Sequence, residues 1–352
     1  MTRIPSSPPT VSPLALDEHR PLWSVMIPVY NCAEYIPAAI ESVLVQDLGE
    51  VFMQIEVVDD ASTDSDVEEM VRELGKGRVR YFRHRENVGS LRNFETCINR
   101  SKGKLVHLLH GDDRVKPGFY QKMTKLFERY PESGAALCNF NLIDASGKRS
   151  HDYSKLSKTE GILKNGFLRI AMLQPIQYVT MVVRREVYEH LGSFYGMPYG
   201  EDWEMWVRIA RYYSIAYTPE ILAEYRFHPG SLSSRLGVLG NSIPHLLHSR
   251  ALIQQHILDQ RLPDRESKLA IEKGKEHCAF YIMGIAEATL REGGNNDKAH
   301  GFVKKALELS KSPAVIVKAI KFYLLMPFMS TWRDLKRGNK LLYIKIRKMF
   351  RS

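Results

Sequence analysis

Cysteine is scarce in this sequence, and the cysteines present are scattered. Cys32, Cys97, Cys138 and Cys278 stand far apart without a CxxC pair, which argues against a zinc site and against a disulfide framework. The first residues lack the apolar core of a secretory signal. No uninterrupted apolar run is long enough to span a bilayer. These absences predict reduced thiols and a cytoplasmic location.

Positive charge is concentrated at one end of the chain. The 352 residues carry a formal net charge of +10. Residues 311–352 hold eleven Lys or Arg and one acid, Asp334, which accounts for the whole excess. A globally basic protein would suggest nucleic acid, whereas a neutral body with a basic tail indicates a more local anionic partner. We therefore expect no nucleic-acid binding.

Strand-like and helix-like segments alternate in the first half of the chain. Short runs rich in β-branched residues predict strands, at 23–30, 54–58, 79–82, 104–109 and 135–143. Apolar residues at helical spacing predict helices between them, at 36–44, 67–74, 91–98 and 119–127. This alternation is typical of an α/β fold with a mostly parallel sheet and right-handed crossovers.

Two of the predicted strands run directly into a pair of carboxylates, Asp59-Asp60 and Asp112-Asp113. The carboxyl ends of parallel strands share one edge of a sheet, and ligands of open α/β sheets bind there. We therefore expect both pairs to converge on one cleft. Paired carboxylates repel each other unless a cation or hydrogen-bond donors compensate. Oxygen ligands favour Mg²⁺ or Mn²⁺ over zinc.

Six motifs follow one another in a characteristic order. They are 25–31 (Val-Met-Ile-Pro-Val-Tyr-Asn), 57–64 (Val-Val-Asp-Asp-Ala-Ser-Thr-Asp), 87–93 (Asn-Val-Gly-Ser-Leu-Arg-Asn), 111–113 (Gly-Asp-Asp), 200–203 (Gly-Glu-Asp-Trp) and 226–233 (Arg-Phe-His-Pro-Gly-Ser-Leu-Ser). Together they cover roughly residues 23–235, and the set resembles glycosyltransferase family 2. Each motif alone is weak evidence, but six in register are strong.

The resemblance implies a fold, an activity and a set of site residues. It implies the GT-A fold, a Rossmann-like sheet here followed by a helical appendage, and inverting transfer of a sugar from a nucleotide-sugar donor with a divalent cation, Mn²⁺ or Mg²⁺. UDP is the commonest nucleotide among relatives. The implied roles are Pro28, Tyr30, Asn31 and Asp60 around the nucleoside, Arg92 at the diphosphate, Asp112 and Asp113 in the metal motif with Asp113 as the direct ligand, His228 at the metal or diphosphate, and Asp202 as the catalytic base.

Simpler interpretations stay open for several of these residues. Asp202 precedes a helical pattern and would serve as an N-cap, and Arg92 would pair with Glu95 on a helix surface. Tyr30 would be strand-end packing, and His228 a solvated loop histidine. The hydroxyl and acidic residues of the first acidic turn would cap the next helix, with Gly75 at its C-cap; these are Ser62, Thr63 and Asp64.

The chain also departs from the family pattern. Many relatives carry a further acid where this chain has His110-Gly111, which leaves fewer metal ligands, and Ala61 replaces the commoner glycine of the acidic turn. The Gln-x-x-Arg-Trp motif of processive members is missing, which favours addition of a single sugar. We expect the acceptor to be a hydroxyl of a glycan or lipid-linked acceptor, in cell-surface polysaccharide synthesis. The rival interpretations are a metal-dependent nucleotidyltransferase and a catalytically silent nucleotide-sugar-binding module.

The pattern beyond residue 240 is helical. We expect a flexible lead-in at 1–22, a catalytic domain at 23–236, a helical accessory region at 241–310 and a basic amphipathic tail at 311–352. Apolar and aromatic residues alternate with Lys and Arg in the tail, which suits a helix at an anionic membrane surface. A solvated basic helix, or one packed in the bundle, is the alternative. The expected location is cytoplasmic, with peripheral contact at the inner membrane face.

Overall fold

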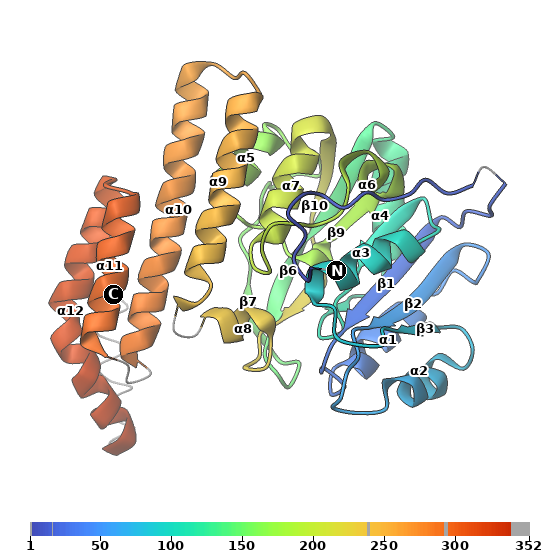
Figure 1. Ribbon diagram of the computed structural model, residues 1–352, viewed down its shortest axis with the longest axis horizontal. Helices are drawn as coiled ribbons and strands as arrows, with labels where there is room; N and C mark the ends of the chain where they lie inside the picture. The colour runs from blue at the N-terminus through green and yellow to red at the C-terminus, as the bar shows by residue number, and fades with distance from the viewer. Residues whose placement is uncertain (1, 16, 238–239, 292–294, 339–352) are drawn as a thin grey trace.

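The chain folds into a mixed α/β body followed by a layer of long helices (Figure 1). The computed structural model describes residues 2–15, 17–237, 240–291 and 295–338. The strands are β1 (Trp23–Val29), β2 (Met53–Asp59), β3 (Arg80–Arg83), β4 (Leu105–Leu108), β5 (Arg114–Val115), β6 (Ser133–Ile143), β7 (Arg149–Asp152), β8 (Gly161–Ile162), β9 (Met181–Arg184) and β10 (Ser214–Arg226).

The helices fall into two groups, those that cover the sheet and those that follow it. The first group is α1 (Ile36–Leu44), α2 (Val67–Gly75), α3 (Ser90–Arg100), α4 (Phe119–Arg129), α5 (Gly166–Met172), α6 (Arg185–Leu191), α7 (Glu201–Tyr212) and α8 (Leu232–Gly237). The second group is α9 (Ile243–Asp259), α10 (Asp264–Arg291), α11 (Asn296–Leu309) and α12 (Pro313–Gly338).

The sheet is mixed, with parallel pairs on both sides of a central antiparallel strand. Its order is β3-β2-β1-β4-β9-β6-β10-β5, with β7 on β6 and β8 on β10. β1 pairs in parallel with β2 and β4, and β6 with β10, whereas β9 lies antiparallel between β4 and β6. The predicted α/β class with a mostly parallel sheet is confirmed. The antiparallel strand β9 was not predicted, because it lies beyond residues 23–143, where the alternating strand and helix patterns were found.

Both faces of the sheet are covered, which explains why β1 and β2 are buried along their whole length. Apolar residues of α1, α2 and α4 pack on one face. Residues of α3, α5, α6 and α7 pack on the other, where Trp203 and Trp206 are fully buried. Trp203 of the fifth motif and the nearby Trp206 on the same helix therefore belong to the core.

Three parallel strands bring their carboxyl ends to one edge. Val29, the last residue of β1, is in register with Asp59, the last residue of β2. Trp23 of β1 is in register with Leu105 of β4, which also runs parallel. The loops that follow these strands carry Tyr30, Asp60 and the segment 110–113. The sheet thus places the predicted site segments next to one another.

The long helices pack on the body and on each other. α9 contacts α7, and α10 contacts both α5 and α9. A separate apolar cluster joins α10, α11 and α12. The helices α10 and α11 lie side by side (Figure 1), and the predicted helical character of this region is confirmed. Among the described helices, none is both long enough and apolar enough to cross a membrane. The tail residues Leu341 to Arg351 lie outside the described part of the chain.

The N-terminal segment is not the flexible lead-in that was predicted from the sequence. The side chain of Val11 is buried. The carbonyls of Pro5 and Pro9 accept hydrogen bonds from the amides of Gly196 and Ser193, at 2.9 and 2.8 Å. The segment is therefore attached to the body, because backbone groups and one apolar anchor find partners there.

Candidate active site

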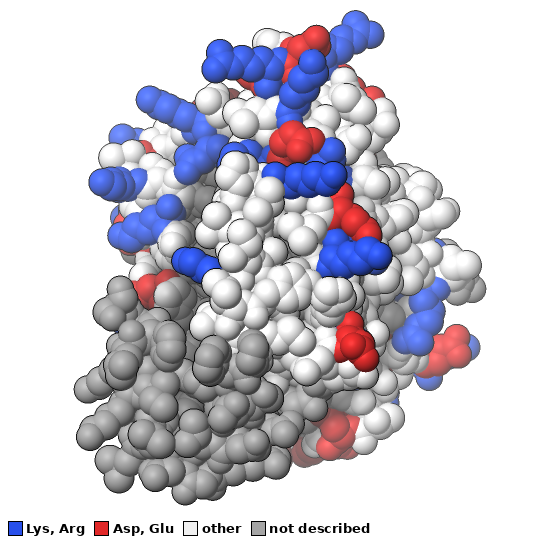
Figure 2. Space-filling view, turned by 90° about the vertical axis from the view of Figure 1, so that its left-hand side faces the viewer, with Lys and Arg blue, Asp and Glu red and all other residues white. Residues whose placement is uncertain are grey.

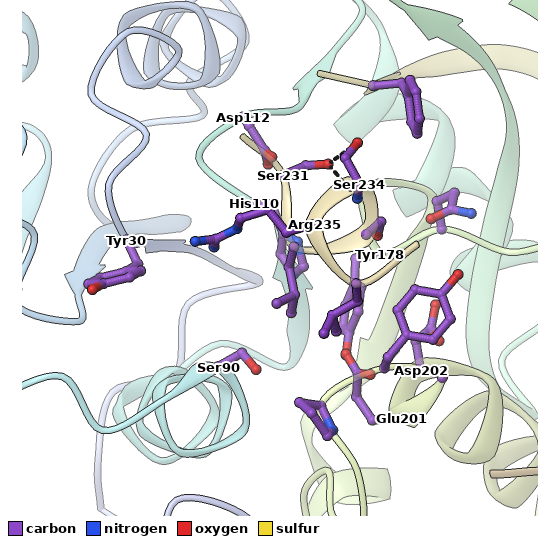
Figure 3. Close-up of a pocket in the computed structure, with 18 of the residues that line it drawn as sticks. Tyr30, Ser90, His110, Asp112, Tyr178, Glu201, Asp202, Ser231, Ser234 and Arg235 are labelled. Atoms are coloured by element: carbon purple, nitrogen blue, oxygen red, sulfur yellow. Dashed lines mark hydrogen bonds between the residues drawn. The ribbon is translucent and has the colours of Figure 1, made fainter. Parts of the chain in front are cut away.

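A single large cavity of about 1480 Å³ opens where the three strands end. Seven of the nine predicted site residues line it: Pro28, Tyr30, Asn31, Asp60, Asp112, Asp202 and His228. Figure 3 shows His110 and Asp112 between Tyr30 on one side and Glu201 and Asp202 on the other. The structure therefore brings together acids from three distant segments of the sequence. Arg92 and Asp113 do not line the cavity.

Asp60 lies at the end of β2 and is 2% exposed. Its Oδ1 accepts from the amide of Val88 at 2.6 Å, and its Oδ2 accepts from the amide of Gly89 and from Asn87 Nδ2, at 2.9 and 2.8 Å. Burial raises the pKa of Asp60, and the two amides oppose that rise. A carboxylate offers about four acceptor positions, so Oδ1 retains one for a donor from a ligand.

The rest of the acidic turn connects strand ends and does not cap α2. Asp59 Oδ1 accepts from the amide and hydroxyl of Ser62, at 2.9 and 2.6 Å. Thr63 donates its amide to Asn31 Oδ1 at 2.8 Å. The cap of α2 is Asp66, whose Oδ1 accepts from the amide of Glu69 at 3.0 Å. The capping interpretation of Ser62 and Thr63 was therefore wrong.

Two further details of the acidic turn differ from expectation. Asp64 Oδ2 accepts from the amide of Ala33 at 2.9 Å, so it ties the turn to the loop after β1. The C-cap of α2 is Lys76, in a left-handed conformation, and Gly75 is the last helical residue. Asp59 itself pairs with Arg83 and accepts from Tyr81, so only Asp60 of this acid pair reaches the cavity.

The residues after β1 also reach the cavity. Tyr30 is 41% exposed and lines the cavity, so it is not strand-end packing. Asn31 has a positive φ of 49° and is held from both sides. Its amide donates to Ser62 Oγ at 3.0 Å, while its side chain accepts from Thr63. The two loops therefore form one rigid rim.

His110, Asp112 and Asp113 form a group with the donor set of a metal site. Each offers one ligand atom, and these atoms lie within 4.8 Å of one another. The Nε2 atom of His110 is buried without a hydrogen-bond partner among the described residues. Burial lowers the pKa of His110, which favours the neutral, metal-binding imidazole. His110 therefore offers a third candidate ligand atom where the sequence had indicated a missing acid.

Gly111 makes this arrangement possible. A Cβ at this position would lie 2.6 Å from Val29 Cγ1 and 3.0 Å from Cys32 Sγ. The amide of Gly111 also donates to the carbonyl of Pro28 at 3.1 Å. The segment that carries the candidate ligands is thus pressed against the end of β1.

Arg226 donates hydrogen bonds to both Asp112 and Asp113. Its amide donates to Asp113 Oδ1 at 2.8 Å, and its Nε donates to the carbonyl of Asp112 at 2.7 Å. Asp113 is 1% exposed, and burial together with the charge of Asp112 raises its pKa. One oxygen of Asp113 is already engaged, so only its second oxygen is free of protein donors among the described residues.

His228 reaches the same aspartate from the closing segment. Its Nε2 lies 3.1 Å from Asp112 Oδ2, and its ring packs against Tyr35 at a centroid distance of 4.5 Å. Burial alone would raise the pKa of Asp112, but the hydrogen bond with His228 and the nearby His110 lower it. His228 is 6% exposed, so the solvated-loop interpretation was wrong.

Asp202 lies in the first turn of α7, whose N-cap is Gly200. It is 8% exposed, and its oxygens accept from the amide of Trp203 at 2.7 Å and from Gln174 Nε2 at 2.5 Å. Burial raises its pKa, and these donors oppose the rise. Burial and the charge of Asp202 also raise the pKa of Glu201, which accepts from Tyr178 at 3.1 Å. The N-cap interpretation of Asp202 was wrong.

Arg92 stands outside the cavity, contrary to the expectation from the resemblance. Its Nη1 donates to Glu95 at 2.6 Å, and its Nε donates to the carbonyl of Thr2 at 2.9 Å. The surface interpretation is the one that the structure supports. Among described residues, the Lys or Arg side chains that line the cavity are Arg3 and Arg235.

The cavity residues to which sequence reasoning gave no role include four with polar or charged side chains near the candidate ligands or Asp202: His110, Gln174, Glu201 and Arg235. His110 carried a signal, since it stands beside the metal motif at a position that departs from the family. Glu201 precedes the predicted base directly. Gln174 and Arg235 lie in segments without interpretable periodicity, so nothing local marked them.

Two curated relatives with sequence similarity are glycosyltransferases by name. An uncharacterized glycosyltransferase of Haemophilus influenzae is 31% identical over 228 residues, covering 62% of this chain and 69% of that protein. One from Rickettsia felis is 27% identical over 252 residues, covering 68% of this chain. The chain spans only 41% of that second relative. The family model for glycosyl transferase family 2 matches residues 24–192.

Solved structures with the same fold are also glycosyltransferases. Staphylococcus aureus TarS 1-349 in complex with UDP-GlcNAc has a TM-score of 0.59 at 15% identity, over 90% of this chain and 91% of that one. The mannosyltransferase PcManGT of Pyrobaculum calidifontis, in complex with GDP-Man and Mn²⁺, has a TM-score of 0.53 at 17% identity, over 98% and 91%. Such identities show the GT-A fold alone. Together with the relatives and the family match, they lead to one conclusion: the chain belongs to glycosyltransferase family 2.

Proposed function

We propose that this protein is a metal-dependent, inverting glycosyltransferase that adds one sugar at a time. The donor is a nucleoside-diphosphate sugar, with UDP as the preferred nucleotide. The acceptor is a hydroxyl of a glycan or lipid-linked glycan, in cell-surface polysaccharide synthesis. One observation carries the proposal: Asp60, Asp112 and Asp202, from three distant segments, line a single cavity.

Asp202 is the proposed catalytic base. An acceptor hydroxyl is a poor nucleophile at neutral pH, so a carboxylate within hydrogen-bond reach has to take its proton, and such help is worth about 10²–10⁴-fold. The raised pKa of Asp202 brings it closer to neutral pH, where a general base works best. Inversion requires the base and the leaving group on opposite faces of the sugar. In Figure 3, Asp112 lies near the top of the view and Asp202 toward the lower right.

The candidate ligands fit a divalent cation. His110, Asp112 and Asp113 would hold it, and the unpartnered His110 Nε2 supports the assignment. Carboxylates suit Mg²⁺ or Mn²⁺, whereas an imidazole is more typical of transition metals, so this set favours Mn²⁺. When bound, the ion supplies a Lewis acid for the charge that develops on the leaving diphosphate. His228 orients Asp112 from the other side.

The remaining residues bind the donor. Asp60 accepts a hydrogen bond from the nucleobase of the donor at the free acceptor position of its Oδ1. Pro28, Tyr30 and Asn31 form the rim around the nucleoside. With Arg92 engaged by Glu95, we assign the diphosphate contact to Arg235 on α8, whose planar fork of donors suits phosphate oxygens.

The test compares Asp202→Asn with Asp66→Asn in the presence of Mn²⁺ and a panel of nucleotide sugars. Donor binding is measured by thermal shift, and transfer by release of nucleoside diphosphate. Asp202→Asn should keep donor binding and lose about 10²–10⁴-fold in turnover. Asp66 caps α2 far from the chemistry, and Asn is an equally good cap, so its variant should behave like wild type. Full turnover by Asp202→Asn, or release of pyrophosphate with nucleotide transfer, would refute the proposal.

Peripheral membrane contact through α12 is part of the proposal. Val315, Ala319 and Phe322 face the bundle, while the opposite side of the helix exposes Ile316, Val317, Ile320 and Leu324, by 41–67%. Figure 2 shows this side of the molecule, where uncharged surface lies among both basic and acidic side chains. An exposed apolar stripe on a helix that carries Lys318 and Lys321 suits an anionic membrane interface.

Vesicle sedimentation tests this contact with phosphatidylcholine vesicles that contain or lack phosphatidylserine. We expect the full chain to bind only the anionic vesicles and the double variant Ile320→Glu with Leu324→Glu to lose binding. The matched control is Leu258→Glu with Leu269→Glu, on α9 and α10, because both leucines are 51% exposed. Equal binding by the two double variants would rule out α12 as the contact.

A further inference from the structure

The cavity extends well beyond the predicted donor site, along one face of α10. Its lining includes His277, Tyr281, Gly284, Ile285, Ala288 and Thr289. These positions recur at intervals of three and four residues, so they form a single stripe on the helix. The region expected to be an accessory appendage therefore forms a wall of the active-site cavity.

The stripe begins next to Asp202. The ring of His277 packs edge-on against Trp203 at 5.4 Å, and its Nε2 lies 3.5 Å from the amide of Gln174. Gln174 donates in turn to Asp202. The end of the stripe nearest His277 is thus connected to the proposed catalytic base through a single residue, Gln174.

The wall carries no charge, although α10 is rich in charged residues. The charged side chains of the helix lie on its other faces, and none of them lines the cavity. Burying a phosphate or carboxylate against such a wall would be costly. A ligand on this wall is therefore neutral, which separates it from the diphosphate at the other end of the cavity.

Aromatic rings with linked hydroxyls give the wall a mixed character. The hydroxyls of Tyr199 and Tyr281 lie 2.6 Å apart, and Ser242 Oγ lies 3.0 Å from that of Tyr281. Aromatic side chains combine an apolar ring with a polar tip. A pyranose ring has the matching chemistry, since its C–H face is apolar and its edge carries hydroxyls.

We propose that the α10 stripe is the acceptor subsite and that it binds a neutral sugar unit of the acceptor. This inference rests on the proposed function, because it takes Asp202 as the base. It assigns acceptor recognition to the helical region and donor recognition to the sheet edge.

Gly284 gives a direct way to fill the subsite. A Cβ built on Gly284 meets no atom within 4 Å outside its own helix, so a larger side chain has room to project into the cavity. Gly301, on α11, is equally unobstructed and does not line the cavity. Gly284→Phe and Gly301→Phe are therefore matched variants, and Ala288→Phe on the same stripe is a second blocking variant should Gly284→Phe fail to fold.

Saturation-transfer NMR on the full chain with methyl glycosides of glucose, galactose and N-acetylglucosamine tests the inference. UDP with Mn²⁺ serves as the reporter of the donor site. We expect sugar-proton signals for wild type and Gly301→Phe, loss of these signals in Gly284→Phe, and unchanged UDP signals in all three.

Each contrary outcome has a separate meaning. The acceptor subsite is overturned if wild type gives no glycoside signals, or if the signals persist in both Gly284→Phe and Ala288→Phe. If the UDP signal is normal in these experiments, the proposed function is unaffected. Loss of UDP binding in wild type removes the proposed function itself. With octyl glucoside below its micellar concentration, signals on the alkyl chain but not on the sugar would show that the stripe binds lipid, and would also overturn the inference.

Discussion

The hydrogen bond from Gln174 to Asp202 gives the sharpest test of the proposed base. Gln174 Nε2 lies 2.5 Å from Asp202 Oδ2, inside the cavity. This donor stabilises the ionised carboxylate and opposes the rise in pKa that burial causes. Gln174→Met keeps the side-chain length and removes the donor. The proton on Asp202 is then held more tightly, so the pKa of Asp202 rises further.

The expected size follows from the strength of such bonds. A hydrogen bond to a charged group contributes about 1.5–3 kcal/mol, and one pKa unit corresponds to about 1.4 kcal/mol. The acidic limb of the pH–rate profile should therefore move to higher pH by about one to two units. The rate on the high-pH plateau should stay close to that of wild type, because the base is ionised there in both proteins.

The assay measures initial rates of nucleoside diphosphate release from pH 5 to 9, with Mn²⁺ and a donor selected by thermal shift. The matched control is Gln255→Met, since Gln255 donates to the exposed Asp259 far from the cavity. An acidic limb that stays in place in Gln174→Met, or that moves to lower pH, would refute the assignment of Asp202 as the titrating base.

Three further changes have clear expected outcomes. The pKa of Glu201 is raised in the folded protein, so the folded state holds a proton there that the unfolded chain has already lost. Wild type should therefore lose stability as the pH rises above the ordinary pKa of a glutamate, and Glu201→Gln should lose less. The melting temperature from pH 5 to 9 measures both. Ala61 has a φ of 60°, a left-handed conformation that is strained for a residue with a Cβ. Ala61→Gly should therefore raise the free energy of unfolding in urea by up to about 1 kcal/mol; a decrease would show that the backbone at Ala61 is not strained. Arg92→Gln should leave the KM for donor unchanged and Arg235→Gln should raise it, because only Arg235 lines the cavity; the reverse result would restore the family-based role of Arg92.

The sequence by itself determined the first four strands and the parallel direction in which they run. Runs of β-branched residues alternate with amphipathic helices, and parallel strands share one edge at their carboxyl ends. The convergence of Asp60 and Asp112 on one cavity follows from that rule alone. Asp202 was located through the order of the motifs, since no local periodicity connects it to the first two acids.

Only the tertiary structure decided which side chains face the cavity. Asp59 and Asp60 are neighbours in sequence, yet Asp59 turns to Arg83 and Tyr81 while Asp60 lines the site. Arg92 matches a motif, yet a glutamate on its own helix and a carbonyl of the N-terminal segment take its donors. Partners of this kind come from contacts distant in sequence, which periodicity does not record.

The same reason explains the role of the long helices. The pattern beyond residue 240 predicted helices but contained nothing about the surface each would cover. The stripe on α10 becomes part of the cavity because α10 packs against α5 and α9 beside the sheet edge. Local sequence determines that a helix forms and which residues share a face; the packing of the whole chain determines what that face meets.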